Sequence, residues 1–139
     1  MLLPKKVKHR KWHTMRHNPN KPKVETRGTT VAFGSFGLKA EAPGRIHSNQ
    51  IEAARKTISR NLEKTGKLWI RVFPDKPYTM KGAEVPMGKG KGEPKGYEVI
   101  VWHGRVLYEV DGIKEVVAKE AMRKAGSKLP LKTRFVTRI

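Results

Sequence analysis

GKLWIRVFPDKP, residues 66–77, joins a strand pattern to a basic glycine loop, MGKGKG, residues 87–92. In residues 68–73, leucine, isoleucine and valine alternate with tryptophan, arginine and phenylalanine, which is the period of two of a strand with at least one buried face. Pro74 and Pro77 cannot donate hydrogen bonds to a ladder. We therefore predict a strand over residues 68–73, which the prolines end.

The loop combines three glycines with two lysines. Its backbone can approach another surface closely, while the ammonium groups reach for anions. A nucleotide-triphosphate loop needs Ser or Thr after Gly-Lys, and here Gly follows each pair. Glu93 stands where the third glycine of a dinucleotide fingerprint belongs. No mononucleotide site is therefore predicted. The two remaining interpretations are a contact with a phosphate backbone and a solvated turn whose lysines maintain solubility.

The composition favours the phosphate contact. The 139 residues include 31 Lys and Arg against 12 Asp and Glu, a net charge of +19. Such an excess repels itself in a compact state unless a polyanion neutralises it, so nucleic acid is the leading partner. A membrane is a poor second, because no apolar run approaches the roughly 20 residues that span a bilayer. We predict one domain with one tail and no membrane partner.

Cysteine is absent, which excludes disulfides, thiolate nucleophiles and cysteine-bearing metal sites. The first residues lack the apolar core of a secretory signal. The chain is accordingly interpreted as mature and cytosolic.

Residues 1–27 are predicted to form a basic, extended arm. They hold nine Lys or Arg, one acid and three prolines, with no apolar periodicity. This arm has too little apolar surface to fold alone, so we expect it to become ordered against RNA. Trp12 would stack on a base. The candidate RNA contacts of the arm, besides Trp12, are Lys5, Lys6, Lys8, Arg10, Lys11, His13 and Arg16.

His9, His13 and His17 are spaced four residues apart, and on a helix they would line one face like metal ligands. Structural zinc sites are usually closed by cysteines, and the arm has no carboxylate before Glu25. The sequence Asn-Pro-Asn at residues 18–20 also argues against a long helix. We predict no metal site, and histidines that contact RNA or solvent.

Residues 28–139 are predicted to form one α+β domain, with two helices packed on a largely antiparallel sheet. The composition of residues 29–36 predicts the first strand. A hairpin is predicted from residues 97–102 and 105–110 around His-Gly, and a final strand over residues 131–139. A turn is predicted at residues 42–45. The first helix is predicted to be capped by His47 or Ser48 and to end at a C-cap, Gly66, and its apolar stripe consists of Ile51, Ala54, Ile58 and Leu62. The second helix is predicted to bury Ile113, Val117, Ala121 and Ala125.

Outside the arm and the loop, three arginines are candidate RNA contacts. Arg45 lies in the predicted turn, Arg55 on the polar side of the first helix, and Arg134 on the basic face of the last strand. For Arg55 the alternative is simple solvation.

Seven segments carry a likeness to a known family. They are residues 1–11, 33–40, 50–55, 67–77, 87–92, 106–109 and 128–133. Together, and in this order, they resemble the L-sixteen family of bacterial-type large-subunit ribosomal proteins over nearly the whole chain. Pro86 departs from the usual Arg of the family and Thr65 from a frequent basic residue, and the chain is a few residues longer at 17–26.

The resemblance implies an α/β-hammerhead fold, binding to large-subunit ribosomal RNA, neighbouring ribosomal proteins as partners, and a place near the A-site tRNA and the P-site tRNA. It implies no cofactor and no homo-oligomer, and it leaves a bacterial or an organellar ribosome open. RNA contacts carried over by the resemblance are Lys5, Lys6, Lys8, Arg10, Lys11, Lys67, Arg71, Lys76, Lys89 and Lys91. The tRNA-proximal loop, residues 80–92, would use Met80, Lys81, Met87, Gly88, Lys89, Gly90, Lys91 and Gly92.

The sequence disfavours two functions other than a ribosomal role. An RNA-modifying enzyme or nuclease is disfavoured because the only aspartates, Asp75 and Asp111, each lie beside turn residues. A free RNA chaperone would suit the charge but not the ordered α+β pattern. The sequence therefore predicts a structural protein that braces folded RNA through phosphate and shape contacts and performs no catalysis.

Overall fold

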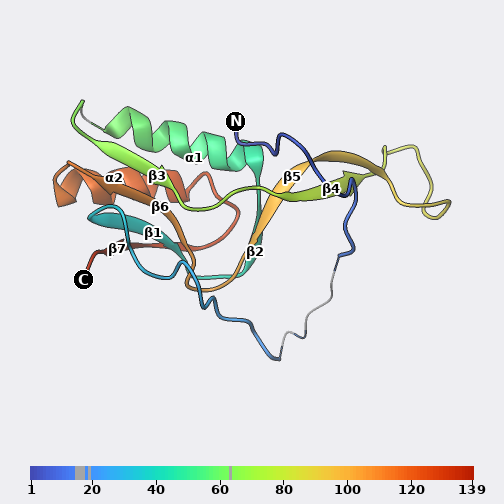
Figure 1. Ribbon diagram of the computed structural model, residues 1–139, viewed down its shortest axis with the longest axis horizontal. Helices are drawn as coiled ribbons and strands as arrows, with labels where there is room; N and C mark the ends of the chain where they lie inside the picture. Colours follow the sequence, from blue (N-terminus) through green and yellow to red (C-terminus); the bar gives the residue numbers. More distant parts are fainter. Residues whose placement is uncertain (15–17, 19, 63) are drawn as a thin grey trace.

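The computed structural model describes residues 1–14, 18, 20–62 and 64–139 (Figure 1). Within these residues, the chain forms two strands, a helix, four strands, a second helix and a last strand. In order they are β1 (Phe36–Ala40), β2 (Gly44–His47), α1 (Ser48–Asn61), β3 (Lys67–Ile70), β4 (Lys76–Met80), β5 (Glu93–Val101), β6 (Val106–Asp111), α2 (Glu115–Gly126) and β7 (Thr133–Thr137).

The strands form two sheets, with the orders β3-β6-β1-β7 and β2-β5-β4. All neighbouring strands in both sheets are antiparallel. The two helices pack against this framework, so the predicted α+β class is confirmed, although two sheets replace the single one. The β4–β5 pair projects from the body of the molecule, and the loop of residues 81–92 forms its tip (Figure 1).

The predicted hairpin of residues 97–110 is wrong. β5 and β6 are consecutive, but they belong to different sheets. The turn between them binds the end of β1 instead: the N–H of Gly104 donates to the carbonyl of Ala40, and the N–H of Ala40 donates to that of Arg105, both at 2.8 Å. Gly104 has φ +101°, which a residue with a side chain rarely adopts. The turn therefore directs the chain from one sheet into the other.

The first strand begins at Phe36, not at residue 29. Three consecutive N–H groups, those of Ala32, Phe33 and Gly34, donate to one carboxylate oxygen of Glu109 at 2.7, 2.8 and 3.1 Å. In an extended strand, side chains and hydrogen-bonding groups alternate in direction. A chain whose three successive N–H groups meet at one atom must curl, so these residues form no strand.

Two strands lie where turns or breaks are predicted. β2 begins at Gly44, inside the predicted turn, and the strand predicted to end at Phe73 already ends at Ile70. Pro77 lies within β4, at the edge of its sheet. A proline is tolerated on an edge strand because no second neighbour needs its missing N–H.

The helix α1 begins where the sequence predicts and ends earlier. Its N-cap is His47, whose N–H donates to the side-chain oxygen of Gln50 at 2.9 Å. Ile51, Ala54 and Ile58 are buried, as their spacing predicts. The C-cap is Leu62, with an extended backbone, and not Gly66, because Leu62 turns away from the helix axis to pack against the core.

The core lies between the four-stranded sheet and the two helices. The hydroxyl of Tyr108 on β6 donates to the carbonyl of Ile51 at 2.8 Å, which ties the sheet to α1. In α2, Ala121 and Ala125 are buried as predicted, whereas Val117 is only half-buried, and so is Ile113, which precedes the helix. The other buried residues of α2 are Ala118 and Met122. Small side chains on α2 let it pack closely against α1.

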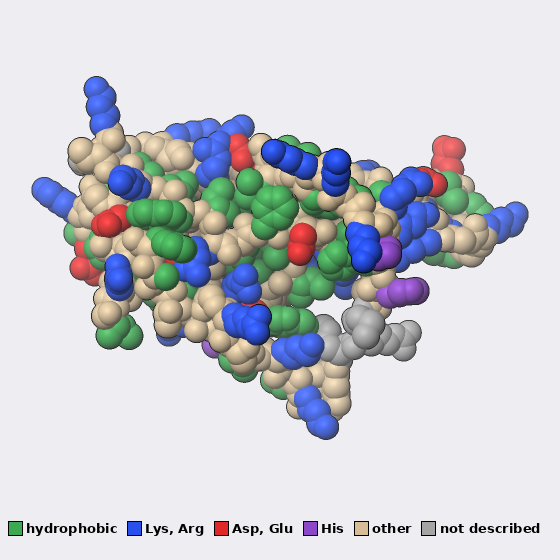
Figure 2. Space-filling view, in the orientation of Figure 1, with side chains coloured by type: hydrophobic (Ala, Val, Ile, Leu, Met, Phe, Trp, Pro, Cys, Tyr) green, Lys and Arg blue, Asp and Glu red, His purple; other side chains and the backbone are tan. Residues whose placement is uncertain are grey.

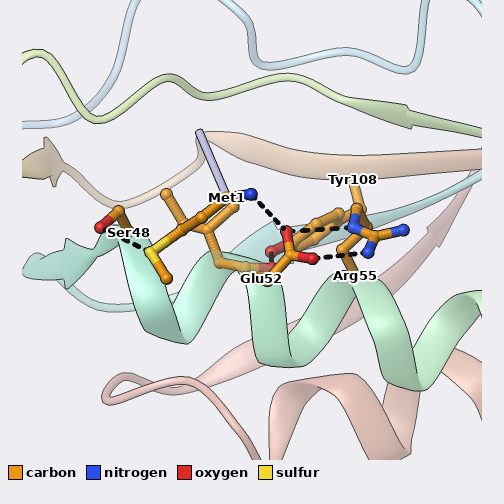
Figure 3. Close-up of polar contacts among 6 residues, drawn as sticks. Met1, Ser48, Glu52, Arg55 and Tyr108 are labelled. Atoms are coloured by element: carbon orange, nitrogen blue, oxygen red, sulfur yellow. Dashed lines mark hydrogen bonds and ion pairs between the residues drawn. The ribbon is translucent and has the colours of Figure 1, made fainter. Parts of the chain in front are cut away.

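The N-terminus lies against α1 (Figure 3). The amino group of Met1 is 3.8 Å from Glu52, which also receives two hydrogen bonds from Arg55 at 3.1 and 2.5 Å. The hydrogen bond from Arg55 lowers the pKa of Glu52. Leu2 packs against the core. The beginning of the arm is thus held on the domain, and the basic residues that follow leave it from a fixed point.

Gly34 has no room for a side chain, which gives a first prediction. A Cβ at this position would lie 2.5 Å from the carbonyl oxygen of Val110. We expect Gly34→Ala to lower the free energy of unfolding by about 1 to 3 kcal/mol, measured by urea unfolding, because the segment before β1 must move away from β6. The control is Gly82→Ala, whose Cβ would meet only Val85 at 3.6 Å. Equal stabilities of the two variants would contradict this packing.

Candidate nucleic-acid interface

The arm displays its cations along the surface of the domain. Lys5, Lys6, Lys8, Arg10 and His13 are exposed, and Lys11 is half-buried. Trp12 is 41% exposed. Arg16, a predicted RNA contact, and His17, the last of the three histidines spaced four residues apart, lie outside the described residues. The described part of the arm therefore presents a row of cations with an aromatic ring at its end.

The arm meets the β4–β5 hairpin. Arg10 pairs with Glu93 at 3.4 Å, and the ammonium group of Lys11 donates to the carbonyl of Lys91 at 3.4 Å. In return, the ammonium group of Lys91 donates to the carbonyl of Trp12. Two basic segments about 80 residues apart in sequence thus form one surface, which we call the arm–hairpin surface and define as residues 5–13 and 81–92. Figure 2 shows Lys and Arg side chains gathered over the hairpin.

The glycine loop is an exposed turn with a left-handed backbone. Gly88, Lys89 and Gly90 have φ of +92°, +59° and +97°. A Cβ on either glycine would find no atom within 4 Å, so backbone conformation and not space accounts for glycine there. The ammonium group of Lys81, at the start of the loop, donates to the carbonyl of Gly88 and links the two sides of the loop. Met87 at the tip is 93% exposed.

The other predicted contacts do not join this surface as a group. Lys67 is exposed at the start of β3, and Arg134 on β7 lies 3.8 Å from Glu41. Arg55 is paired with Glu52 on α1. These cations are distributed over the domain.

Lys76 and Arg45 surround a buried carboxylate. Glu98 on β5 is 2% exposed, and it lies 3.7 Å from Lys76, 3.8 Å from Arg45 and 3.5 Å from the Nδ1 of His47. Lys76 itself is only 5% exposed. A buried charge is tolerated when an opposite charge lies close to it, so these cations neutralise Glu98 within the three-stranded sheet.

Arg71 has a similar role on the other sheet. It pairs with Glu109, which is fully buried on β6 and also receives the N–H groups of residues 32–34. Burial alone would raise the pKa of Glu109, but the hydrogen bonds from Arg71, Gly34 and Phe33 and the charge of Arg71 lower it below 4.5. Glu109 is therefore ionised at neutral pH and holds β3 and residues 32–34 together.

The sequence interpretation missed both carboxylates. Glu109 is the only charged residue in the run Val106–Val110, and a lone acid in an apolar strand indicates a buried partner. That signal was present in the sequence, but it does not name the partner. The meeting of Lys91 with Trp12 has no local sequence signal.

Among the described residues, no group of three or more His, Asp or Glu side chains is placed to hold a metal ion. Neither helix, in the part of the chain that the structure describes, is long and apolar enough to cross a bilayer.

The fold and the arm–hairpin surface define a class: a basic α+β protein with cations and an aromatic ring exposed on one surface. Comparison with known proteins makes the class specific. The family model described as ribosomal protein L16p/L10e matches residues 4–136, and the chain belongs to this family. The resemblance read from the sequence is thereby confirmed, and so is the expectation that the chain is a structural ribosomal protein and not an enzyme.

Curated relatives match this chain over nearly their full lengths. Proteins named large ribosomal subunit protein uL16 from Afipia carboxidovorans, Nitrobacter winogradskyi and Rhodopseudomonas palustris strain BisB18 are 51%, 53% and 52% identical to this chain. Each alignment covers 100% of this chain and 98% of the relative.

Proposed function

We propose that this protein is a structural constituent of the large ribosomal subunit in the cytoplasm, where it binds ribosomal RNA through the arm–hairpin surface and contacts neighbouring ribosomal proteins. The family and the bacterial relatives named for the large subunit support the placement. The main support for this binding surface is a pair of hydrogen bonds between the arm and the loop. Lys11 donates to the backbone carbonyl of Lys91, and Lys91 donates to the backbone carbonyl of Trp12. These hydrogen bonds join seven cations of predicted RNA contact on one side of the molecule.

Binding would depend mainly on phosphate contacts. Exposed lysines and arginines neutralise phosphates and release counterions, which makes affinity depend steeply on salt. Within the proposed interface the contacts are Lys5, Lys6, Lys8, Arg10, Lys11, Lys89 and Lys91. Arg10 pairs with the exposed Glu93, which leaves both side chains in solvent. The carboxylates that pair with Arg45, Arg55, Arg71 and Lys76 are largely buried, so these four residues have a structural role first. Any contact that they make with RNA would be secondary.

We further propose that the loop of residues 80–92 lies toward the A-site tRNA and the P-site tRNA. The proposal is supported by the position of the loop at the tip of the projecting hairpin (Figure 1). Met87, Lys89 and Lys91 are exposed there. Pro86 contributes no charge and no N–H donor at this tip. Any anion contact near residue 86 would therefore come from Lys81, Lys89 or Lys91.

The two loop lysines can be tested by the salt dependence of binding. We expect Lys89→Ala with Lys91→Ala to reduce the magnitude of the log–log slope of affinity against salt by about 1.4 to 1.8, because two phosphate contacts are lost. The measurement is filter binding of the full chain to large-subunit ribosomal RNA. Lys119→Ala with Lys124→Ala removes the same charge from exposed positions of α2 and serves as the control. The same slope for the loop variant and the unaltered protein would refute the role of the loop.

The cellular assignment has its own test. The protein should co-sediment with large ribosomal subunits after a wash of moderate salt and be released at high salt. Recovery only in the free fraction at every salt concentration would contradict the proposed function.

A further inference from the structure

Four aromatic side chains and an arginine line one surface groove of about 810 Å³. They are Trp12, Phe33, Trp69, Phe73 and Arg71. This volume is within the range of roughly 300–1,000 Å³ typical of ligand sites. On the face drawn in Figure 2, hydrophobic side chains gather over β3 and the segment that follows it. Phe33 is 56% exposed and Phe73 45% exposed. The groove is therefore an open aromatic surface and not part of the closed core.

Phe33 has an ordered environment despite its exposure. Its ring stacks on that of Trp69, with 6.3 Å between centroids and an interplanar angle of 23°. The guanidinium carbon of Arg71 lies 4.9 Å from the centroid of the same ring, a cation–π distance. More than half of the Phe33 side chain remains available to another ring.

The buried carboxylate of Glu109 fixes this arrangement. It accepts the N–H of Phe33 at 2.8 Å and pairs with Arg71. The backbone under the ring and the cation beside it are thus held by one group. A surface side chain fixed in advance loses little conformational entropy when a ligand binds, so the site is preorganised.

The lysines of the arm near the groove fit a nucleotide. Arg71, Lys76 and Arg105 also line the groove, but each is paired with a glutamate, so their charges are already balanced. Trp12 and Asp75 also line an adjoining hollow of about 200 Å³ together with Lys6 and Lys8. A base seated in the groove would thus place its phosphates beside lysines of the arm. Aromatic rings and arginine planes are the groups on which proteins stack unpaired RNA bases.

We propose that the groove binds one unpaired nucleobase of the RNA, stacked on Phe33 beside Arg71. The proposal rests on the proposed function and adds a base contact to the phosphate contacts. Phe33 and Trp69 then serve as a stacking platform, and Glu109 is a positioning residue for that platform.

The test uses the full chain with Trp12→Phe and Trp102→Phe, which leaves Trp69 as the sole tryptophan. The probes are a single-stranded 12-mer of adenylate and a 12-mer with the same sugar-phosphate backbone but no bases. We expect the adenylate 12-mer alone to quench Trp69 fluorescence and to bind roughly tenfold more tightly at equal salt. Phe33→Leu in this background should abolish most of that preference and leave the salt slope unchanged.

Two variants control for folding. Phe33→Tyr keeps the ring and should keep the preference. Phe135→Leu makes the same change in another aromatic pair, in which the ring centroids of Phe135 and Phe36 are 5.7 Å apart, and it should also keep the preference for the adenylate 12-mer. Equal affinity for the two probes with unmoved Trp69 fluorescence, or a preference that survives Phe33→Leu, would overturn the proposal. If salt-dependent binding persists in that case, the proposed function stands. Binding of both probes without salt dependence would defeat the proposed function as well.

Discussion

Replacing Glu109 with glutamine is expected to lower the free energy of unfolding by about 3 to 5 kcal/mol at pH 7, because it removes one member of a buried ion pair. Arg71, whose side chain is 20% exposed, would lose its counter-charge. The N–H groups of residues 32–34 would share a weaker, neutral acceptor. Equilibrium unfolding in urea, followed by circular dichroism, measures the effect.

The effect of Glu109→Gln should depend on pH in a definite direction. The pKa of Glu109 is lowered in the folded protein, so its ionised form stabilises the fold above the ordinary value of 4.5. That stabilisation is lost as pH falls from 4.5 through the folded pKa. The difference between the unaltered protein and Glu109→Gln should therefore be full at pH 7 and shrink below pH 4.5.

Glu120→Gln provides the matched control. Glu120 also pairs with an arginine, Arg123, but both side chains are largely exposed. Exposed pairs contribute little, so this variant should be nearly as stable as the unaltered protein. A similar cost for the two substitutions would contradict the structural role of Glu109.

The second large effect is expected from the arm. Changing Lys5, Lys6, Lys8, Arg10 and Lys11 together to alanine should weaken binding to large-subunit ribosomal RNA roughly a thousandfold at 0.15 M salt. Five lost phosphate contacts reduce the magnitude of the salt slope by about 3.5 to 4.5, and the two binding curves should converge near 1 M salt. Circular dichroism should show an intact domain, because these side chains are outside the core.

The control for the arm removes five exposed lysines around α2, which lies away from the hairpin in Figure 1. They are Lys114, Lys119, Lys124, Lys128 and Lys132. Net charge falls equally in the two variants. If total charge alone governed binding, both would lose affinity equally, whereas the arm–hairpin surface requires a much larger loss for the arm variant.

Local patterns in the sequence predict the buried face of α1 well. The stripe of Ile51, Ala54 and Ile58 follows from helical periodicity alone, and the structure buries all three residues. The pairing of strands is harder to predict from local sequence. The residues around Gly104 have the signature of a hairpin, but hydrogen bonds to the distant Ala40 send β5 and β6 into separate sheets.

The site shows the same division. Exposed lysines of the arm and the loop could be named from charge and glycine content, because those properties are local. Their joining through Lys91 and Trp12 depends on the path of the whole chain. Phe33 looked like a strand residue, because its neighbours favour β structure, and only the contact with Glu109 places it in a curled, exposed segment.

The most direct test of the account is a salt titration of the affinity of the full chain for large-subunit ribosomal RNA. With seven phosphate contacts on the arm–hairpin surface, the log–log slope should lie between about −5 and −6. A slope near zero would show that cationic contacts do not hold the protein to its RNA, and it would contradict the account.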